Sequence, residues 1–273
     1  MSVSINQIVN ANVYINGQKV GYWPYGYNSF HFDITKYLKP GEKNTLAVRL
    51  ENLPESSRWY PGAGLYRNVH LIITEDAYIP VWGTYITTPS VNEKFAKVNV
   101  RTKVVLPEGA DPAKYSVETS VWNPNKQKLT AVRTSLAQMK YNNNQAEQEF
   151  VIQAPSLWSP EMPALYSAET RLYEGDKLKD IYTTPFGIRS IEIIPDKGFF
   201  LNGKRTVFKG VCNHHDLGPL GAAVNDAAIR RQIRILKDMG CNAIRTSHNM
   251  PAPELIRACD EMGMMIMAES FDE

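Results

Sequence analysis

Apolar and polar residues alternate with a period of two through residues 1–78 of this 273-residue chain. The runs "VYINGQKVGY", "FHFDIT", "NTLAVRL" and "NVHLIIT" carry the alternation, and none of them has a helical period. Asn16-Gly17 divides the first run, and this dipeptide is the strongest short signal for a hairpin turn. The pattern therefore predicts an antiparallel β-sandwich over residues 1–78.

Residues 79–185 continue the same period in shorter runs that are separated by turn signals such as "PEGADP", "NPNK" and "YEGDK". Frequent turns between short strands are typical of an immunoglobulin-like sandwich, although the Cys…Trp…Cys spacing of antibody domains is absent. We expect strands at residues 79–88, 96–106, 115–122, 128–135, 145–152, 165–173 and 177–186.

The pattern changes after residue 185. A hairpin is expected around Asn202-Gly203, and "TVFKGVC" then reads as a strand. Residues 226–239 predict a helix, with Asn225 able to cap its start and Gly240 able to end it. The apolar face of that helix consists of Ile229, Ile233 and Leu236.

A strand, a helix and a strand follow, in "CNAIRT", "PELIRACDEM" and "MMIMAE". Leu255, Ile256 and Cys259 form the expected apolar face of the second helix. Short apolar strands alternating with helices predict a parallel sheet, as in a doubly wound fold or a (β/α)₈ barrel. The first strand leads into "KGVCNHHDLGPLG" rather than GxGxxG, which weakens a dinucleotide site and favours the barrel.

Polar residues gather where these three strands end. Because the loops after parallel barrel strands meet on one face, their side chains are candidates for a functional site. His214 and His248 are favoured, since each directly follows a separate strand, whereas His31 and His70 lie inside strands and are expected to have no function. The orientation of His215 stays open. The candidates are Asn213, His214, His215 and Asp216, then Arg245, Thr246, Ser247, His248 and Asn249, and finally Glu269, Asp272 and Glu273.

Two other chemistries are conceivable for these residues. His214, His248 and Glu269 could bind a metal, but the first strand lacks a His-x-His pair, so a metal-free binding pocket is favoured. Ser247 lacks the surroundings of a nucleophile elbow. Arg245 could either line the pocket or pair with a carboxylate of the barrel.

Composition narrows the function classes. A formal net charge of +2 and 21% charged residues give no reason to expect nucleic acid or a membrane surface as a partner, and the composition is that of a soluble protein. No apolar run has transmembrane length, and the first ten residues do not resemble a signal peptide. Cys212, Cys241 and Cys259 form no CxxC pair and are expected to be buried free thiols.

The segments together resemble glycoside hydrolase family 2, the β-galactosidases, β-glucuronidases and β-mannosidases. The resemblance rests on "SRWYPGAGLYRNVHL", "LWSPEMPALY", "FGIRSIEI", "GKRTVFKGVCNHHDLGPLGAA" and "MGCNAIRTSHNMPAPELIRACDEMGMMIMAESFDE". It implies a multidomain, mainly β fold: part of a jelly-roll-type sandwich (1–78), an immunoglobulin-like sandwich (79–185) and the first three βα units of a TIM barrel (186–273).

The resemblance also implies a retaining exo-β-glycosidase acting on a β-linked oligosaccharide or glycoside, with β-galactosides favoured because "NHHD" is the β-galactosidase-like form. In the family, two glutamates after the fourth and seventh barrel strands perform the reaction. No carboxylate here matches either position. We therefore expect an internal fragment that is inactive alone, and a non-catalytic carbohydrate-binding or scaffold module or a β-glucuronidase or β-mannosidase type stays open.

Binding residues follow from the same resemblance. His214 and His248 would hydrogen-bond the terminal sugar, and Arg245 and Asn249 would shape its pocket.

Two further regions are implicated. Arg58 and Trp59 would reach toward the barrel mouth from the first sandwich, although Trp59 could serve packing alone. Glu273 aligns with a magnesium ligand of some β-galactosidases, and no other cofactor is implied. A homo-oligomer remains open.

Overall fold

The computed structural model describes residues 2–6, 10–51, 64–138 and 145–270. Contacts between residues divide the chain into two compact units. Unit 1 is Met1–Ile73, Lys209–Cys259 and Met264–Glu273, and unit 2 is Thr74–Phe208 and Asp260–Gly263. Unit 1 therefore joins the first predicted sandwich to the predicted barrel strands. The domain boundaries expected near residues 78 and 185 stay predictions.

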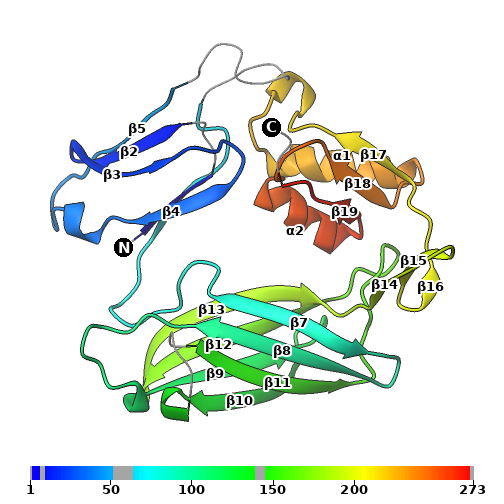
Figure 1. Ribbon diagram of the computed structural model, residues 1–273, viewed down its shortest axis with the longest axis horizontal. Coiled ribbons are helices and arrows are strands. Elements are labelled where there is room, and N and C mark those ends of the chain that lie inside the picture. Colours follow the sequence, from blue (N-terminus) through cyan, green and yellow to red (C-terminus); the bar gives the residue numbers. More distant parts are fainter. Residues whose placement is uncertain (1, 7–9, 52–63, 139–144, 271–273) are drawn as a thin grey trace. The chain divides into compact units, whose positions relative to one another are not determined.

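The N-terminal part of unit 1 is an antiparallel β structure, as the alternation predicts. Its strands form two three-stranded sheets, in the orders β4-β1-β6 and β3-β2-β5. Figure 1 labels β2, β3 and β5 of the second sheet. Asn16 and Gly17 have φ values of 52° and 82°, which the β2–β3 hairpin requires. β1 is a strand that the sequence pattern does not predict. The elements are β1 (Ser2–Asn6), β2 (Ala11–Ile15), β3 (Gln18–Trp23), β4 (Ser29–Asp33), the 3₁₀ helix η1 (Thr35–Tyr37), β5 (Leu46–Arg49) and β6 (Val69–Ile72).

The core of this sandwich follows directly from the alternation. Every second residue of β2 is buried, namely Ala11, Val13 and Ile15, and these pack with Phe30 and Ile34. His31 and His70 lie in β4 and β6 with exposed side chains.

Unit 2 contains all seven strands expected for an immunoglobulin-like sandwich. A four-stranded sheet, β10-β9-β12-β13, and a three-stranded sheet, β11-β8-β7, enclose its core. β7 starts at Thr84, later than predicted, because a turn joins the N–H of Gly83 to the carbonyl of Pro80 at 2.8 Å. The elements are β7 (Thr84–Val91), β8 (Phe95–Lys103), η2 (Pro112–Lys114), β9 (Tyr115–Trp122), β10 (Lys128–Ser135), η3 (Leu136–Gln138), β11 (Gln145–Gln153), β12 (Leu165–Glu174) and β13 (Lys177–Gly187).

A small antiparallel sheet completes unit 2, in the order β14-β15-β16. Asn202 and Gly203, with φ values of 52° and 74°, form the predicted turn between β15 and β16. The strands are β14 (Ile191–Ile194), β15 (Gly198–Leu201) and β16 (Lys204–Arg205).

The C-terminal part of unit 1 has the predicted parallel sheet. Strands β17 (Gly210–Asn213), β18 (Ala243–Thr246) and β19 (Met265–Met267) pair in parallel, with helices α1 (Asp226–Asp238) and α2 (Pro253–Met262) beside them (Figure 1). The first strand begins only at Gly210, whereas the pattern predicts it from Thr206. A short 3₁₀ helix, η4 (Gly218–Leu220), lies between β17 and α1.

The predicted buried face is confirmed for α1 but only in part for α2. Asn225 caps α1 by accepting the N–H of Ala228 at 2.9 Å, and the predicted face of α1 is buried. On α2, however, Leu255 and Ile256 are only half-buried, and Glu254 is 7% exposed. The predicted apolar face is therefore wrong in part, because Glu254 turns inward to accept a hydrogen bond from Asn68 Nδ2 at 2.6 Å. None of the helices within the described ranges is long and apolar enough to cross a membrane.

Candidate functional site

A carboxylate joins the ends of β18 and β19. Glu269 accepts a hydrogen bond from Arg245 Nε through Oε1, and its Oε2 lies 3.0 Å from His248 Nδ1. The backbone N–H of Glu269 donates to the Thr246 hydroxyl at 3.0 Å, which fixes the chain after β19. The parallel pairing of the strands thus brings Arg245, His248 and Glu269 together, as the strand-end argument predicts.

The bridging carboxylate fixes which nitrogen of the His248 ring carries a hydrogen. A carboxylate only accepts hydrogen bonds, so His248 Nδ1 carries the hydrogen that faces Glu269. Arg245 Nη2, at 3.3 Å from the same nitrogen, is then a neighbour rather than a donor to it. In the neutral ring, Nε2 keeps its lone pair and can accept a hydroxyl hydrogen.

Glu269 is held in its charged form. Burial raises the pKa of this carboxyl, but the hydrogen bonds from Arg245 and His248 outweigh burial and leave the pKa below its ordinary value. Arg245 also reaches the Cys212 sulfur, 3.7 Å from Nη1, across the β17–β18 pair.

The two adjacent histidines after β17 point to different places. The rings of His214 and His248 lie 5.7 Å apart, edge to face. His214 therefore joins Arg245, His248 and Glu269, and we call these four residues the strand-end cluster. The ring of His215 instead lies 4.8 Å from that of Tyr27, in the N-terminal sandwich. Burial, followed by the charge of Arg67 and by His214, lowers the pKa of His215 to about 4. His215 is therefore neutral at pH 7, and its ring packs against Tyr27.

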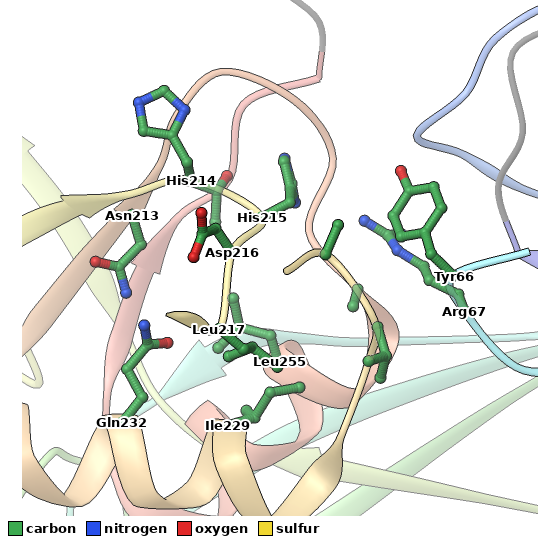
Figure 2. Close-up of a pocket in the computed structure, with 14 residues that line it drawn as sticks. Tyr66, Arg67, Asn213, His214, His215, Asp216, Leu217, Ile229, Gln232 and Leu255 are labelled. Carbon is green, nitrogen blue, oxygen red and sulfur yellow. The ribbon is translucent and has the colours of Figure 1, made fainter. Parts of the chain in front are cut away.

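A small cavity lies beside His215. Its volume is about 40 Å³, far below the several hundred Å³ of a sugar-sized pocket. Figure 2 shows Asn213 facing Gln232 of α1, with Tyr66 and Arg67 on another side of the cavity. The cavity thus lies among the strand-end loops, helix α1 and residues of the N-terminal sandwich.

Arg67 is a central residue that the sequence argument missed. It is 5% exposed, and its guanidinium donates to the carbonyls of Met250 at 2.9 Å and of Tyr27 and Pro251 at 3.2 Å. Burial lowers the pKa of Arg67 to about 10, which still leaves it charged at neutral pH. Its only sequence signal is its place in "GLYRNV", inside a stretch already singled out for the family resemblance.

Tyr25 was missed as well. Its hydroxyl lies 2.5 Å from Asn249 Oδ1 and 3.0 Å from the carbonyl oxygen of Ser270. A tyrosine in a turn of a β-sandwich has no signal that links it to a loop more than 200 residues later in the chain.

Several predicted residues take no part in this cluster. Ser247 is buried, with 2% of its surface exposed. Cys212 is exposed and Cys241 half-buried, so only Cys259 matches the expected buried thiol. Wherever the structure describes the chain, no three His, Cys, Asp or Glu side chains are grouped to hold a metal, so the His214, His248 and Glu269 ligand set is not assembled. The remaining candidates Arg58, Trp59, Asp272 and Glu273 lie outside the described residues.

Sequence models of one family match most of the chain. The model described as Glycosyl hydrolases family 2 matches residues 78–189, and that of the family's TIM barrel domain matches residues 192–273.

Individual relatives agree. The chain is 45% identical to the β-galactosidase BoGH2A of Bacteroides ovatus, covering 97% of this chain and 31% of that protein. It is 40% identical to a putative β-glucuronidase of Formosa agariphila, covering 97% of this chain and 25% of the relative. The crystal structure of a family 2 member from Bacteroides cellulosilyticus matches with a TM-score of 0.91 and 38% identity, over 99% of this chain and 35% of that one. The chain, which spans about a third or less of the length of these proteins, belongs to glycosyl hydrolases family 2.

Proposed function

We propose that this chain is part of a retaining exo-β-glycosidase and that its strand-end cluster binds the terminal sugar, with β-galactosides as the favoured substrates. The joined side chains of Arg245, His248 and Glu269 carry this proposal. Barrels of this kind bind their substrates at the carboxyl ends of the parallel strands, and the polar groups of the cluster are fixed at that edge.

Each group of the cluster has a chemical task in this proposal. Glu269 orients the His248 ring through Nδ1, and His248 Nε2 accepts a hydrogen bond from a sugar hydroxyl. His214, 5.7 Å away ring to ring, adds a second imidazole beside the same hydroxyl groups. The residues of this chain thus bind and orient the sugar, while two glutamates of the barrel supply acid/base and nucleophilic chemistry by family resemblance.

The test is hydrolysis of 4-nitrophenyl β-galactoside by the full-length protein, with the anomeric form of the released sugar read by NMR. A β-product is expected, because a covalent intermediate retains configuration. An inverted product, or no cleavage of any aryl β-glycoside, would overturn the proposal. His248→Ala should lower kcat/KM about tenfold or more, from the loss of a hydrogen bond at the sugar.

His70→Ala is the matched control, since His70 is an exposed histidine in β6 of the same unit. It should leave kcat/KM unchanged.

The relatives include a protein named β-galactosidase and one named putative β-glucuronidase. The same assay with 4-nitrophenyl β-glucuronide therefore decides between these sugars, and preferential cleavage of the glucuronide would replace the galactoside assignment.

A further inference from the structure

A short aromatic loop of the N-terminal sandwich contacts the barrel loops directly. This loop, residues 24–28 with the sequence "PYGYN", connects β3 to β4 and carries Tyr25 and Tyr27. Tyr25 reaches Asn249 and the Ser270 carbonyl, whereas Tyr27 packs on the His215 ring. Two aromatic side chains of one loop thus meet all three segments that follow β17, β18 and β19.

The loop is fixed from its own sandwich. The Tyr66 hydroxyl donates to the carbonyl of Gly26 at 3.2 Å, and Arg67 donates to the carbonyl of Tyr27 at the same distance. Arg67 also holds the carbonyls of Met250 and Pro251, immediately after Asn249. One buried guanidinium therefore fixes both sides of the Tyr25–Asn249 contact, which is the arrangement expected of a preorganised site.

The contact constrains the amide of Asn249. The Tyr25 hydroxyl, 2.5 Å from Oδ1, donates its single hydrogen to that oxygen in preference to the more distant Ser270 carbonyl. With Oδ1 engaged, the two Nδ2 hydrogens of Asn249 are the groups that it can offer to another acceptor. A sugar hydroxyl oxygen is such an acceptor.

From this geometry we propose that Tyr25 is a positioning residue for substrate binding: it fixes the Asn249 side chain so that its amide hydrogens donate to an oxygen of the sugar. The proposal rests on the proposed glycosidase function and adds a residue from the N-terminal sandwich to its binding site. Because a hydrogen bond of this kind acts on bound substrate and transition state alike, its loss should raise KM and leave kcat nearly unchanged.

The experiment compares Tyr25→Phe with wild type in the full-length protein, using the aryl β-glycoside that the wild type cleaves. Tyr25→Phe should raise KM about threefold to tenfold, the effect of one hydrogen bond. Tyr22→Phe is the matched control, since Tyr22 makes the same kind of bond, hydroxyl to Asn10 Oδ1 at 2.6 Å, within the sandwich alone. Its KM should equal that of wild type.

A double-mutant cycle shows whether Tyr25 acts through Asn249. In an Asn249→Ala background, Tyr25→Phe should change KM less than twofold, because the side chain that it positions is gone. Unchanged KM in Tyr25→Phe, or equal effects in both backgrounds, would overturn the positioning role while leaving the glycosidase function standing. Absence of turnover by the wild-type protein would overturn both. Circular dichroism and the melting temperature of each variant establish that it is folded.

Discussion

The two units of this molecule bury different kinds of polar group. Among the described residues of unit 2, the buried polar residues are all neutral: Thr102, Thr119, Ser120, Gln148 and Thr170. Those of unit 1 include two ionisable side chains, Arg67 and Glu254. In unit 2, the side chain of the charged residue Lys179 is 7% exposed. Its ammonium lies 2.6 Å from Glu75 and 2.9 Å from Asp76, and both of these carboxylates are at the surface.

The difference follows from what each unit has to hold together. In unit 2, strand pairing satisfies most of the backbone. The buried Gln148 of β11 reaches across the sandwich, where its Nε2 donates to the Val132 carbonyl of β10, in the facing sheet, at 2.8 Å. In unit 1, loops from distant parts of the sequence meet away from regular pairing. Their carbonyls need donors, and the Arg67 guanidinium supplies them.

The largest effect on stability is expected when the buried charge of Arg67 is removed. Arg67→Met should destabilise unit 1 by about 3 kcal/mol or more, because three carbonyls, one buried and two part-buried, lose a charged donor. Amide hydrogen exchange, read by mass spectrometry, should accelerate at residues 25–28 and at Asn249 and Met250. The loss of unfolding free energy reports on the whole unit, and the exchange rates report on the two loops that Arg67 joins.

Arg101→Met is the control in unit 2. Arg101 pairs with Glu147 at 2.9 Å, but the side chains are 52% and 71% exposed, so the expected loss is below about 1 kcal/mol. Equal losses for the two arginine variants would contradict the distinction between the units.

A smaller effect is expected from the carboxylate at the strand ends. Glu269→Gln replaces a charged acceptor by a neutral one, so Arg245 loses its ion pair and His248 its orienting partner. A loss of about tenfold to a hundredfold in kcat/KM is expected, in the range of one hydrogen bond to a charged group. Steady-state kinetics on the cleaved aryl β-glycoside measures it, with Glu149→Gln in unit 2 as an exposed control.

The pH dependence gives a second measurement at the same residue. The pKa of Glu269 is below its ordinary value of 4.5, so its stabilising contribution is complete above that value. The contribution is lost as the pH falls below 4.5 through the folded-state pKa. The fall in stability between pH 5 and 3 should therefore be shallower in Glu269→Gln than in wild type, and parallel curves would contradict the assigned hydrogen bonds.

The sequence predicted the regular parts of both units well because their signals are local. Alternation located the seven strands of the immunoglobulin-like sandwich, and the Asn-Gly pairs located the β2–β3 and β15–β16 hairpins. Parallel pairing followed from the alternation of strands and helices, and this pairing brings Arg245, His248 and Glu269 together.

The long-range contacts could not be predicted in the same way. Tyr25 and Arg67 lie in a β-sandwich, and their partners at Asn249, Met250 and Pro251 come about two hundred residues later. Periodicity states which face of an element is buried, but not which distant loop it meets. Glu254 shows the same limit, because a charged residue at a buried helix position is understood only once Asn68 is known to face it.

The smallest effect is expected where a buried polar pair of unit 2 is replaced as a pair. Thr119 and Thr170 are fully buried on adjacent strands, with their hydroxyl oxygens 3.1 Å apart. Thr119→Val alone should cost about 1–3 kcal/mol, because it leaves the Thr170 hydroxyl unpaired. The double variant Thr119→Val, Thr170→Val should lie within about 0.5 kcal/mol of wild type, since both partners then become apolar groups of similar shape. Urea unfolding of the three variants measures the cycle. If the double variant loses the sum of the single losses, the hydroxyl pair contributes stability of its own, and the neutral polar groups of unit 2 are as indispensable as Arg67 in unit 1.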